Sequence, residues 1–131
     1  MPVDLYWKRA EGRVAFGVND CCMTVADVIL AAGGPDLMAG YRGRYSTAAG
    51  FVRAYRKRGH ETLEQAVAAS FAAHGAVAAS ARDFDVALVG YLDSGARTVA
   101  PAFFHGGFWF VRTDGGALVT QAEPETIWRL L

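Results

Sequence analysis

The chain has 131 residues, of which 53% are hydrophobic and 20% are charged, with 13 basic and 13 acidic side chains. This length and composition indicate one folded domain with a buried core and exclude a disordered chain. No apolar run approaches the roughly 20 residues of a membrane helix. Residues Met1–Lys8 lack the order of a signal peptide. We therefore expect a protein made in the cytoplasm, without a membrane span.

The first predicted helix runs from Asp20 to about Ala32, and Gly33-Gly34-Pro35 ends it. Asp20 is a favourable N-cap residue. The apolar stripe at helical spacing consists of Cys22, Val25, Ile29 and Ala32. Cys22 is therefore expected in the core. Cys21 lies about 100° away on the helical wheel, at an edge that a substrate could reach.

Cys21 is the candidate catalytic nucleophile of the chain. At the start of a helix, backbone N–H groups and the helix dipole favour a thiolate over a thiol. The alternative is a small, unreactive thiol that only packs. Asp20 is a second candidate catalytic residue, and its alternative role is the helix cap alone. Asp27 has little local reason to lie in mid-helix, so we expect it to pair with Arg42 or Arg44.

Two further helices are predicted before the pattern changes. One begins at Ser46 or Thr47 and ends at Arg58, and the basic residues of its last turn complement the helix dipole without requiring nucleic acid. The other begins at Thr62, which forms a capping box with Gln65, and ends with His74. Together with Asp20–Ala32, these segments place all the predicted helices in the first 75 residues.

The second half of the chain has the alternation of β-strands. The predicted strands cover residues 85–91, 98–104, 108–112, 117–120 and 127–130, with tight turns at 105–107 and 114–116. Helices followed by short strands indicate an α+β fold with an antiparallel sheet. The strands also contain a dense block of aromatic residues. Alternate members of this block must face outward unless other residues cover them, which suggests a protein interface. The block comprises Phe103, Phe104, Phe108, Trp109 and Phe110.

The pattern of cysteines and histidines excludes several kinds of site. Cys21 and Cys22 are the only cysteines and are neighbours, and the strained ring of a vicinal disulfide disfavours their pairing. His60, His74 and His105 are isolated in the sequence, and no zinc-ligand spacing occurs. Phosphate-binding loops and dinucleotide fingerprints are also missing. We expect neither a metal nor a cofactor.

The segment before the first helix resembles a known family. Phe16-Gly17-Val18-Asn19-Asp20-Cys21 is similar to the start of the catalytic helix in the NlpC-type peptidase superfamily, compact papain-like enzymes that cleave peptidoglycan peptides. A closer resemblance is to small relatives encoded in phage tail modules. It extends to Ala26-Asp27, Gly34-Pro35-Asp36, Arg42-Gly43-Arg44-Tyr45 and the terminal Ile127-Trp128-Arg129. The resemblance implies a papain-like fold, with N-terminal helices packed on a C-terminal sheet in one domain spanning residues 1–131.

The same resemblance places an alanine where the enzymes carry their catalytic histidine. In this alignment Phe84-Asp85 replaces a Gly-Asp pair, and Ala100 occupies the position of the base. His105 follows five residues later, about 16 Å along an extended strand. An odd offset also points its side chain to the opposite face. With Ala100 at this position, the resemblance supplies Cys21 with no catalytic histidine.

Two functions follow as hypotheses. The first is a degenerate, inactive domain that serves as a structural or assembly component of a phage tail tip, assembled in the bacterial cytoplasm and bound to other tail proteins. The second is an active cysteine peptidase that cleaves peptidoglycan peptides during infection, with Cys21 as nucleophile and His105 or His60 as base. A third possibility is a cell-wall-binding module that keeps the groove but not the chemistry.

Overall fold

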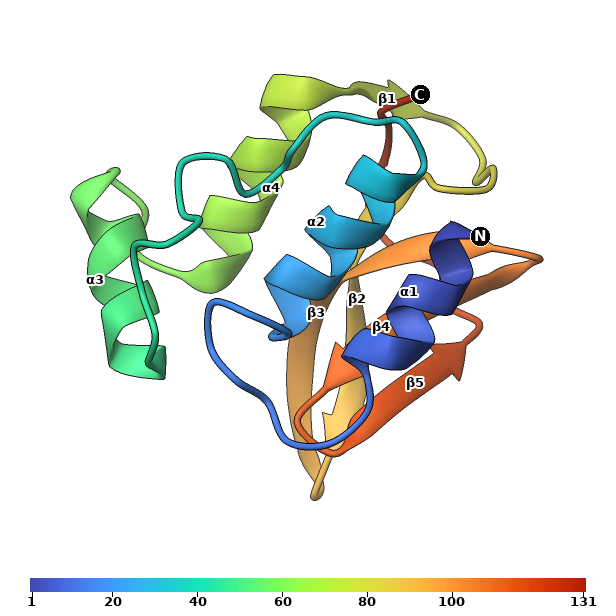
Figure 1. Cartoon of the computed structure of the whole chain (residues 1–131). Coiled ribbons are helices and arrows are strands. Elements are labelled where there is room, and N and C mark those ends of the chain that lie inside the picture. The colour runs from blue at the N-terminus through green and yellow to red at the C-terminus, as the bar shows by residue number, and fades with distance from the viewer.

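The computed structural model describes residues 1–131 as four helices and one six-stranded antiparallel sheet (Figure 1). The helices are α1 (Pro2–Arg9), α2 (Cys21–Ala31), α3 (Ala48–Lys57) and α4 (Leu63–His74). The strands are β1 (Ala76–Ala78), β2 (Val86–Asp93), β3 (Ala96–His105), β4 (Phe108–Thr113), β5 (Gly116–Thr120) and β6 (Ile127–Arg129). The α+β class is therefore confirmed. None of the helices combines the length and apolarity that a membrane crossing requires.

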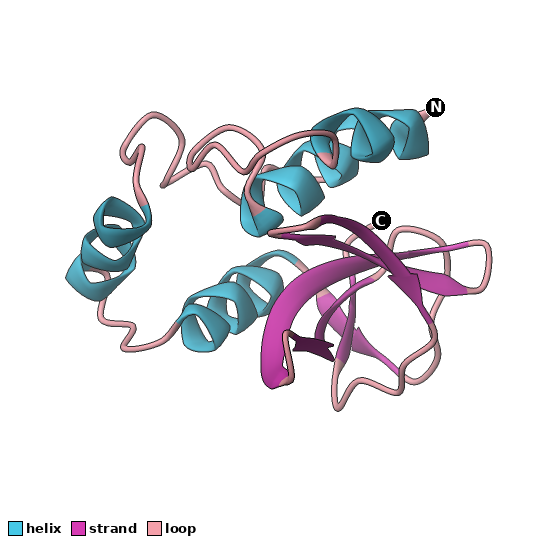
Figure 2. Cartoon of the chain, turned by 90° about the horizontal axis from the view of Figure 1, so that it is seen from below, coloured by secondary structure: helices cyan, strands magenta, loops and turns pink.

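The strands lie in the order β1-β6-β2-β3-β4-β5, so that the C-terminal strand β6 is inserted between β1 and β2. The β3–β4 hairpin closes through Gly106-Gly107, and both glycines have positive φ, as a two-residue hairpin turn requires. Figure 2 shows the sheet strongly curved, with α1 and α2 along one side and α3 farthest from it.

Two apolar clusters cover the two faces of this sheet. The larger one lies between the helices and the face that carries Val86, Phe103 and Phe110. The smaller one lies on the opposite face of β2, β3 and β4 and consists of Ala87, Val89, Ala100, Ala102, Trp109 and Val111. The alternation of side chains along β2 and β3 accounts for this division.

Two elements of the structure were not predicted from the sequence. Helix α1 was not predicted, although Tyr6 is completely buried and donates a hydrogen bond to the Val111 carbonyl at 2.7 Å. Strand β1 lies in an alanine-rich segment directly after α4, where no strand was predicted, and pairs with β6. Most members of the aromatic block are covered, because apolar clusters lie on both faces of the sheet. Only Phe108 is clearly exposed, at 42%.

Candidate functional site

The candidate site begins at the capped N-terminus of α2. One carboxylate oxygen of Asp20 accepts hydrogen bonds from the backbone N–H groups of Cys22 at 3.1 Å and Met23 at 2.9 Å. The other oxygen accepts from the Gly17 N–H and from the Tyr45 hydroxyl, both at 2.7 Å. Asp20 is only 2% exposed, and these four bonds use its acceptor capacity. The predicted cap is confirmed.

The two loop residues that donate to this carboxylate, Gly17 before α2 and Tyr45 after it, lie in close contact with each other. Gly17 has φ of +85°, and a side chain there would collide with the Tyr45 carbonyl oxygen. Burial, followed by the negative charge of Asp20 and the hydrogen bond to it, raises the pKa of Tyr45 far above its ordinary value. The Tyr45 hydroxyl therefore stays protonated and remains a donor to Asp20.

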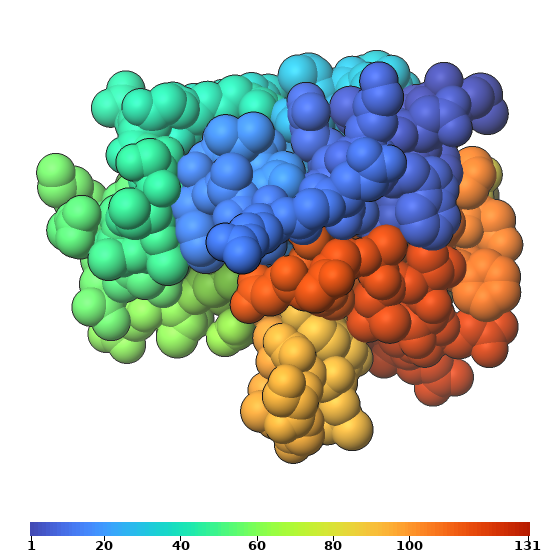
Figure 3. Space-filling view, turned by 60° about the horizontal axis from the view of Figure 1, so that its bottom comes forward, coloured from blue at the N-terminus to red at the C-terminus, as the bar shows by residue number.

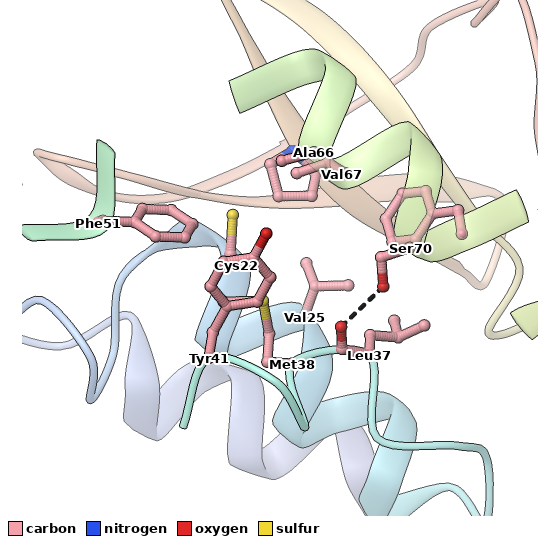
Figure 4. A pocket seen from close by; sticks show the side chains of 11 residues that line it. Cys22, Val25, Leu37, Met38, Tyr41, Phe51, Ala66, Val67 and Ser70 are labelled. Carbon is pink, nitrogen blue, oxygen red and sulfur yellow. Dashed lines mark hydrogen bonds between the residues drawn. The ribbon is translucent and has the colours of Figure 1, made fainter. Parts of the chain in front are cut away.

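Cys22 points into the core, as predicted. Its thiol lines a small cavity of about 20 Å³, room for roughly one water molecule. The cavity lies between α2, α3, α4 and the loop of residues 37–41 (Figure 4). The walls are largely apolar and include Tyr41, Phe51 and Val67, and the Ser70 hydroxyl bonds to the Leu37 carbonyl at 2.7 Å. The contact with Cys21, then burial, then the nearby negative charges raise the pKa of Cys22 well above its ordinary value. Cys22 is thus a packing residue.

Cys21 is half-buried at the first position of α2, where the two apolar clusters meet. Its Sγ lies 3.9 Å from the Cys22 Sγ, and the side chain packs against both clusters. The smaller cluster includes Ala100, which is 2% exposed. The buried residues of this cluster are all apolar, and Tyr91 of β2 packs against the cluster beside them. Burial, followed by the charge of Cys21, raises the pKa of Tyr91 above its ordinary value.

None of the three histidines forms a hydrogen bond with Cys21. The His74 ring bonds to the Ser70 carbonyl at 2.8 Å, and His60 follows the end of α3. The His105 Nδ1 lies 3.6 Å from Asp83 Oδ2, and its ring packs against Phe84 and Phe110. His105 shares a face of β3 with Phe103 and not with Ala100, which confirms the expected reversal of face. His105 is the last residue of β3, next to the hairpin turn, and its side chain is 30% exposed.

An ion-pair network braces the outer side of α2. Asp27 contacts Arg42 at 2.8 Å, which confirms the predicted pair, and Arg42 also contacts Asp36 at 2.8 Å. Arg44 makes no ion pair with Asp27. The pairing with Arg42 lowers the pKa of Asp36. Arg9 of α1 adds a second contact to Asp27 at 3.1 Å, and it was missed because α1 itself was not predicted.

Arg112 is a buried positioning residue that the sequence analysis also missed. Its guanidinium donates to the carbonyls of Gly12 at 2.9 Å, Asn19 at 3.2 Å and Thr113 at 2.7 Å, and it is 1% exposed. These bonds fix the loop that leads into Asp20 and Cys21. The sequence signal that marks it is an arginine directly after the continuous apolar run 108–111. A cation in such a strand is rarely buried unless it is paired.

The groups around Cys21 supply part of a reaction centre. The chain contains no cluster of three histidine, cysteine or acidic side chains that could hold a metal ion. The arrangement supplies a thiol at a capped helix start, a rigid preceding loop and an apolar opposing sheet. It therefore has the support for a nucleophile, and no imidazole forms a hydrogen bond with the Cys21 sulfur.

Comparison with known sequences places the chain in one family. The chain belongs to the family described as a domain of unknown function (DUF6950), which it matches over residues 4–130. No curated protein and no solved structure shows a significant match to it. The family match spans the helices and the sheet together, including the Asp20–Cys21 helix start and the whole of β3.

Proposed function

We propose that this chain is an NlpC-type, papain-like domain without a general base, which acts as a structural or assembly component of a phage tail tip. The observation that carries this proposal is the environment of Cys21. Its side chain packs against an apolar cluster that includes Ala100, and no imidazole bonds to its sulfur. Thiol attack on a peptide bond requires a partner that takes up and returns a proton.

The arrangement of helix and sheet supports the papain-like part of the proposal. A cysteine starts a helix that packs on an antiparallel sheet, and the Arg-Gly-x-Tyr loop returns to that helix through Arg42 and Tyr45. The backbone at Phe84 gives separate support. Phe84 has φ of +67°, a conformation that glycine adopts freely, and the resemblance places a glycine at this position.

The chemistry of Cys21 provides the first test. We expect iodoacetamide to alkylate Cys21 in the native protein no faster than an ordinary thiol with a pKa near 8.5, and we expect no release of peptidoglycan fragments. The Cys21→Ala variant identifies any label that enters at Cys22. Rapid alkylation at neutral pH together with cell-wall hydrolysis would instead establish the peptidase hypothesis.

A reconstructed base provides the second test. The Ala100→His variant tests whether a base at position 100 can reach the thiol of Cys21. The Ala100→Asn variant is its control, because asparagine is polar but is not a base. We expect only the histidine variant to speed up alkylation of Cys21, by about tenfold or more, if both variants remain folded by circular dichroism. Equal rates in the two variants would contradict the assignment of position 100.

The assembly role requires a test in the particle. In a tailed phage that encodes this chain, we expect Cys21→Ala to leave tail assembly and infectivity intact, whereas deletion of the gene prevents assembly of the tail tip. Normal particles that lose infectivity with Cys21→Ala would refute the structural role and favour peptidoglycan cleavage.

A further inference from the structure

The β2–β3 hairpin carries a free strand edge that faces a groove. Strand β2 pairs with β3 along its whole length but with β6 only at Val86 and Ala87. The outer edge of residues 88–93 therefore has no strand partner. Figure 3 shows this hairpin, in yellow, projecting from the body of the molecule. On the other strand, Pro101 of β3 lacks an N–H donor, which makes that edge a poorer template.

The register shows which backbone groups of β2 point outward. Ser94 and Gly95 form a two-residue turn with φ of 50° and 83°, so Asp93 and Ala96 form the hydrogen-bonded pair that closes the hairpin. Bonded and non-bonded pairs then alternate along an antiparallel ladder. The N–H and C=O groups of Leu88, Gly90 and Leu92 therefore point away from β3. Val86 follows the same alternation and is where β6 pairs with β2.

The free edge borders a groove of about 620 Å³, a volume in the range of ligand-binding pockets. Leu88, Val89 and Gly90 line it on the side of β2, and the segment 122–126 lines it as well. The rest of the lining comes from α4, from Arg97 and Val99 of β3, and from Trp128. The backbone of residues 122–126 forms no hydrogen bond within the chain. Two lengths of unpaired backbone thus border the same groove.

The charge of the groove indicates what kind of segment it would accept. Glu64, Glu123 and Glu125 line it, all three are exposed, and none forms an ion pair. The only cation in the lining is Arg97, whose guanidinium lies over the backbone of Gly90. A segment with basic side chains complements this charge.

We infer that this groove binds an extended, basic segment of a partner protein, which adds as a strand to the free edge of β2. Main-chain hydrogen bonds to Leu88 and Gly90 supply the pairing, as in other strand-addition complexes. The glutamates select for lysine or arginine on alternate residues, which lie on the same side of an extended peptide. This inference does not depend on Cys21 or on the function proposed above.

The test uses the full chain and a hexapeptide of alternating lysine and valine, acetylated and amidated, with binding measured by isothermal titration calorimetry at low salt. One control peptide has glutamate in place of lysine. Two further isomers carry N-methyl groups on alternate backbone nitrogens, which removes hydrogen-bond donors while keeping the charge. The protein variant Glu123→Gln/Glu125→Gln is compared with Glu11→Gln, which removes an exposed charge outside the groove lining.

The expected result is binding of the lysine peptide, no detectable binding of the glutamate peptide, and a loss of about tenfold or more for at least one N-methylated isomer. The double glutamine variant should weaken binding about threefold to tenfold, the range expected for two exposed ion pairs. Amide hydrogen exchange should slow at Leu88 and Gly90 when the peptide binds. It should remain unchanged at Val89, which already faces β3.

Several outcomes would overturn the inference. Equal binding of the N-methylated isomers would show attraction by charge alone, and equal binding of the glutamate peptide would show that the groove does not select for basic residues. No binding at millimolar peptide would exclude the site. Concentration-dependent dimerisation that the Glu123→Gln/Glu125→Gln variant abolishes would identify a second copy of the chain as the occupant.

Discussion

The Asp20 carboxylate is predicted to be the largest polar contributor to the stability of the candidate site. In Asp20→Ala, the α2 cap is lost, which costs about 1 kcal/mol. The Gly17 N–H and the buried Tyr45 hydroxyl also lose their acceptor, at about 1–3 kcal/mol each. Because the effects of neighbours are not additive, we expect a total loss of about 3–5 kcal/mol. That loss is a large part of the stability of an ordinary domain.

The measurement is urea-induced unfolding followed by tryptophan fluorescence. Asp20→Asn keeps the side-chain shape and one acceptor oxygen, so it should cost only about 1–2 kcal/mol. The double variant Asp20→Ala/Tyr45→Phe should be destabilised by less than the sum of the single variants, because no hydroxyl is then left unsatisfied. A cost below about 1 kcal/mol for Asp20→Ala, or strict additivity with Tyr45→Phe, would refute this reasoning.

Three further changes test the surroundings. Arg112→Lys cannot reach three carbonyls and should cost about 2–4 kcal/mol in thermal unfolding, whereas the exposed Arg44→Lys should change stability little. Gly17→Ala should cost about 2 kcal/mol or more, because φ is positive and the Tyr45 carbonyl blocks a side chain. Burial raises the pKa of Tyr6 to about 12 from 10.0, so its contribution to stability is complete below pH 10 and is lost as the pH rises toward 12. Tyr6→Phe should therefore flatten the alkaline limb of the stability profile by about 2 kcal/mol.

Local sequence signals predict α2 and its cap well. The Asp20 cap and the Cys22 stripe depend on interactions within a few residues, and the structure confirms both. The pair between Asp27 and Arg42 is also confirmed, because a carboxylate in mid-helix needs a cation and the loop that follows supplies one. The same reasoning left Arg42 and Arg44 as equal candidates, since the path of the loop is set by tertiary packing.

The features that the sequence did not predict depend on long-range contacts. Helix α1 is held by the Tyr6 hydroxyl, which bonds to the Val111 carbonyl far along the chain. Arg112 acts through carbonyls of Gly12 and Asn19, which no pattern within its own strand indicates. The exposure of the aromatic block could not be predicted for a related reason. Alternation shows that Phe103 and Phe104 point to opposite faces, but not that apolar partners cover both faces of the sheet.

The start of a helix is not sufficient by itself to make a cysteine nucleophilic, because nearby charges also act on the thiol. Backbone N–H groups at this end favour negative charge. However, two of these groups are already bonded to the Asp20 carboxylate, which brings its own negative charge beside the cysteines. That charge contributes to the raised pKa of Cys22. A papain-like centre needs a histidine whose imidazolium offsets such a charge and stabilises the thiolate. With Ala100 in the opposing cluster, our proposal assigns the Asp20 cap to the stability of α2 and not to the reactivity of Cys21.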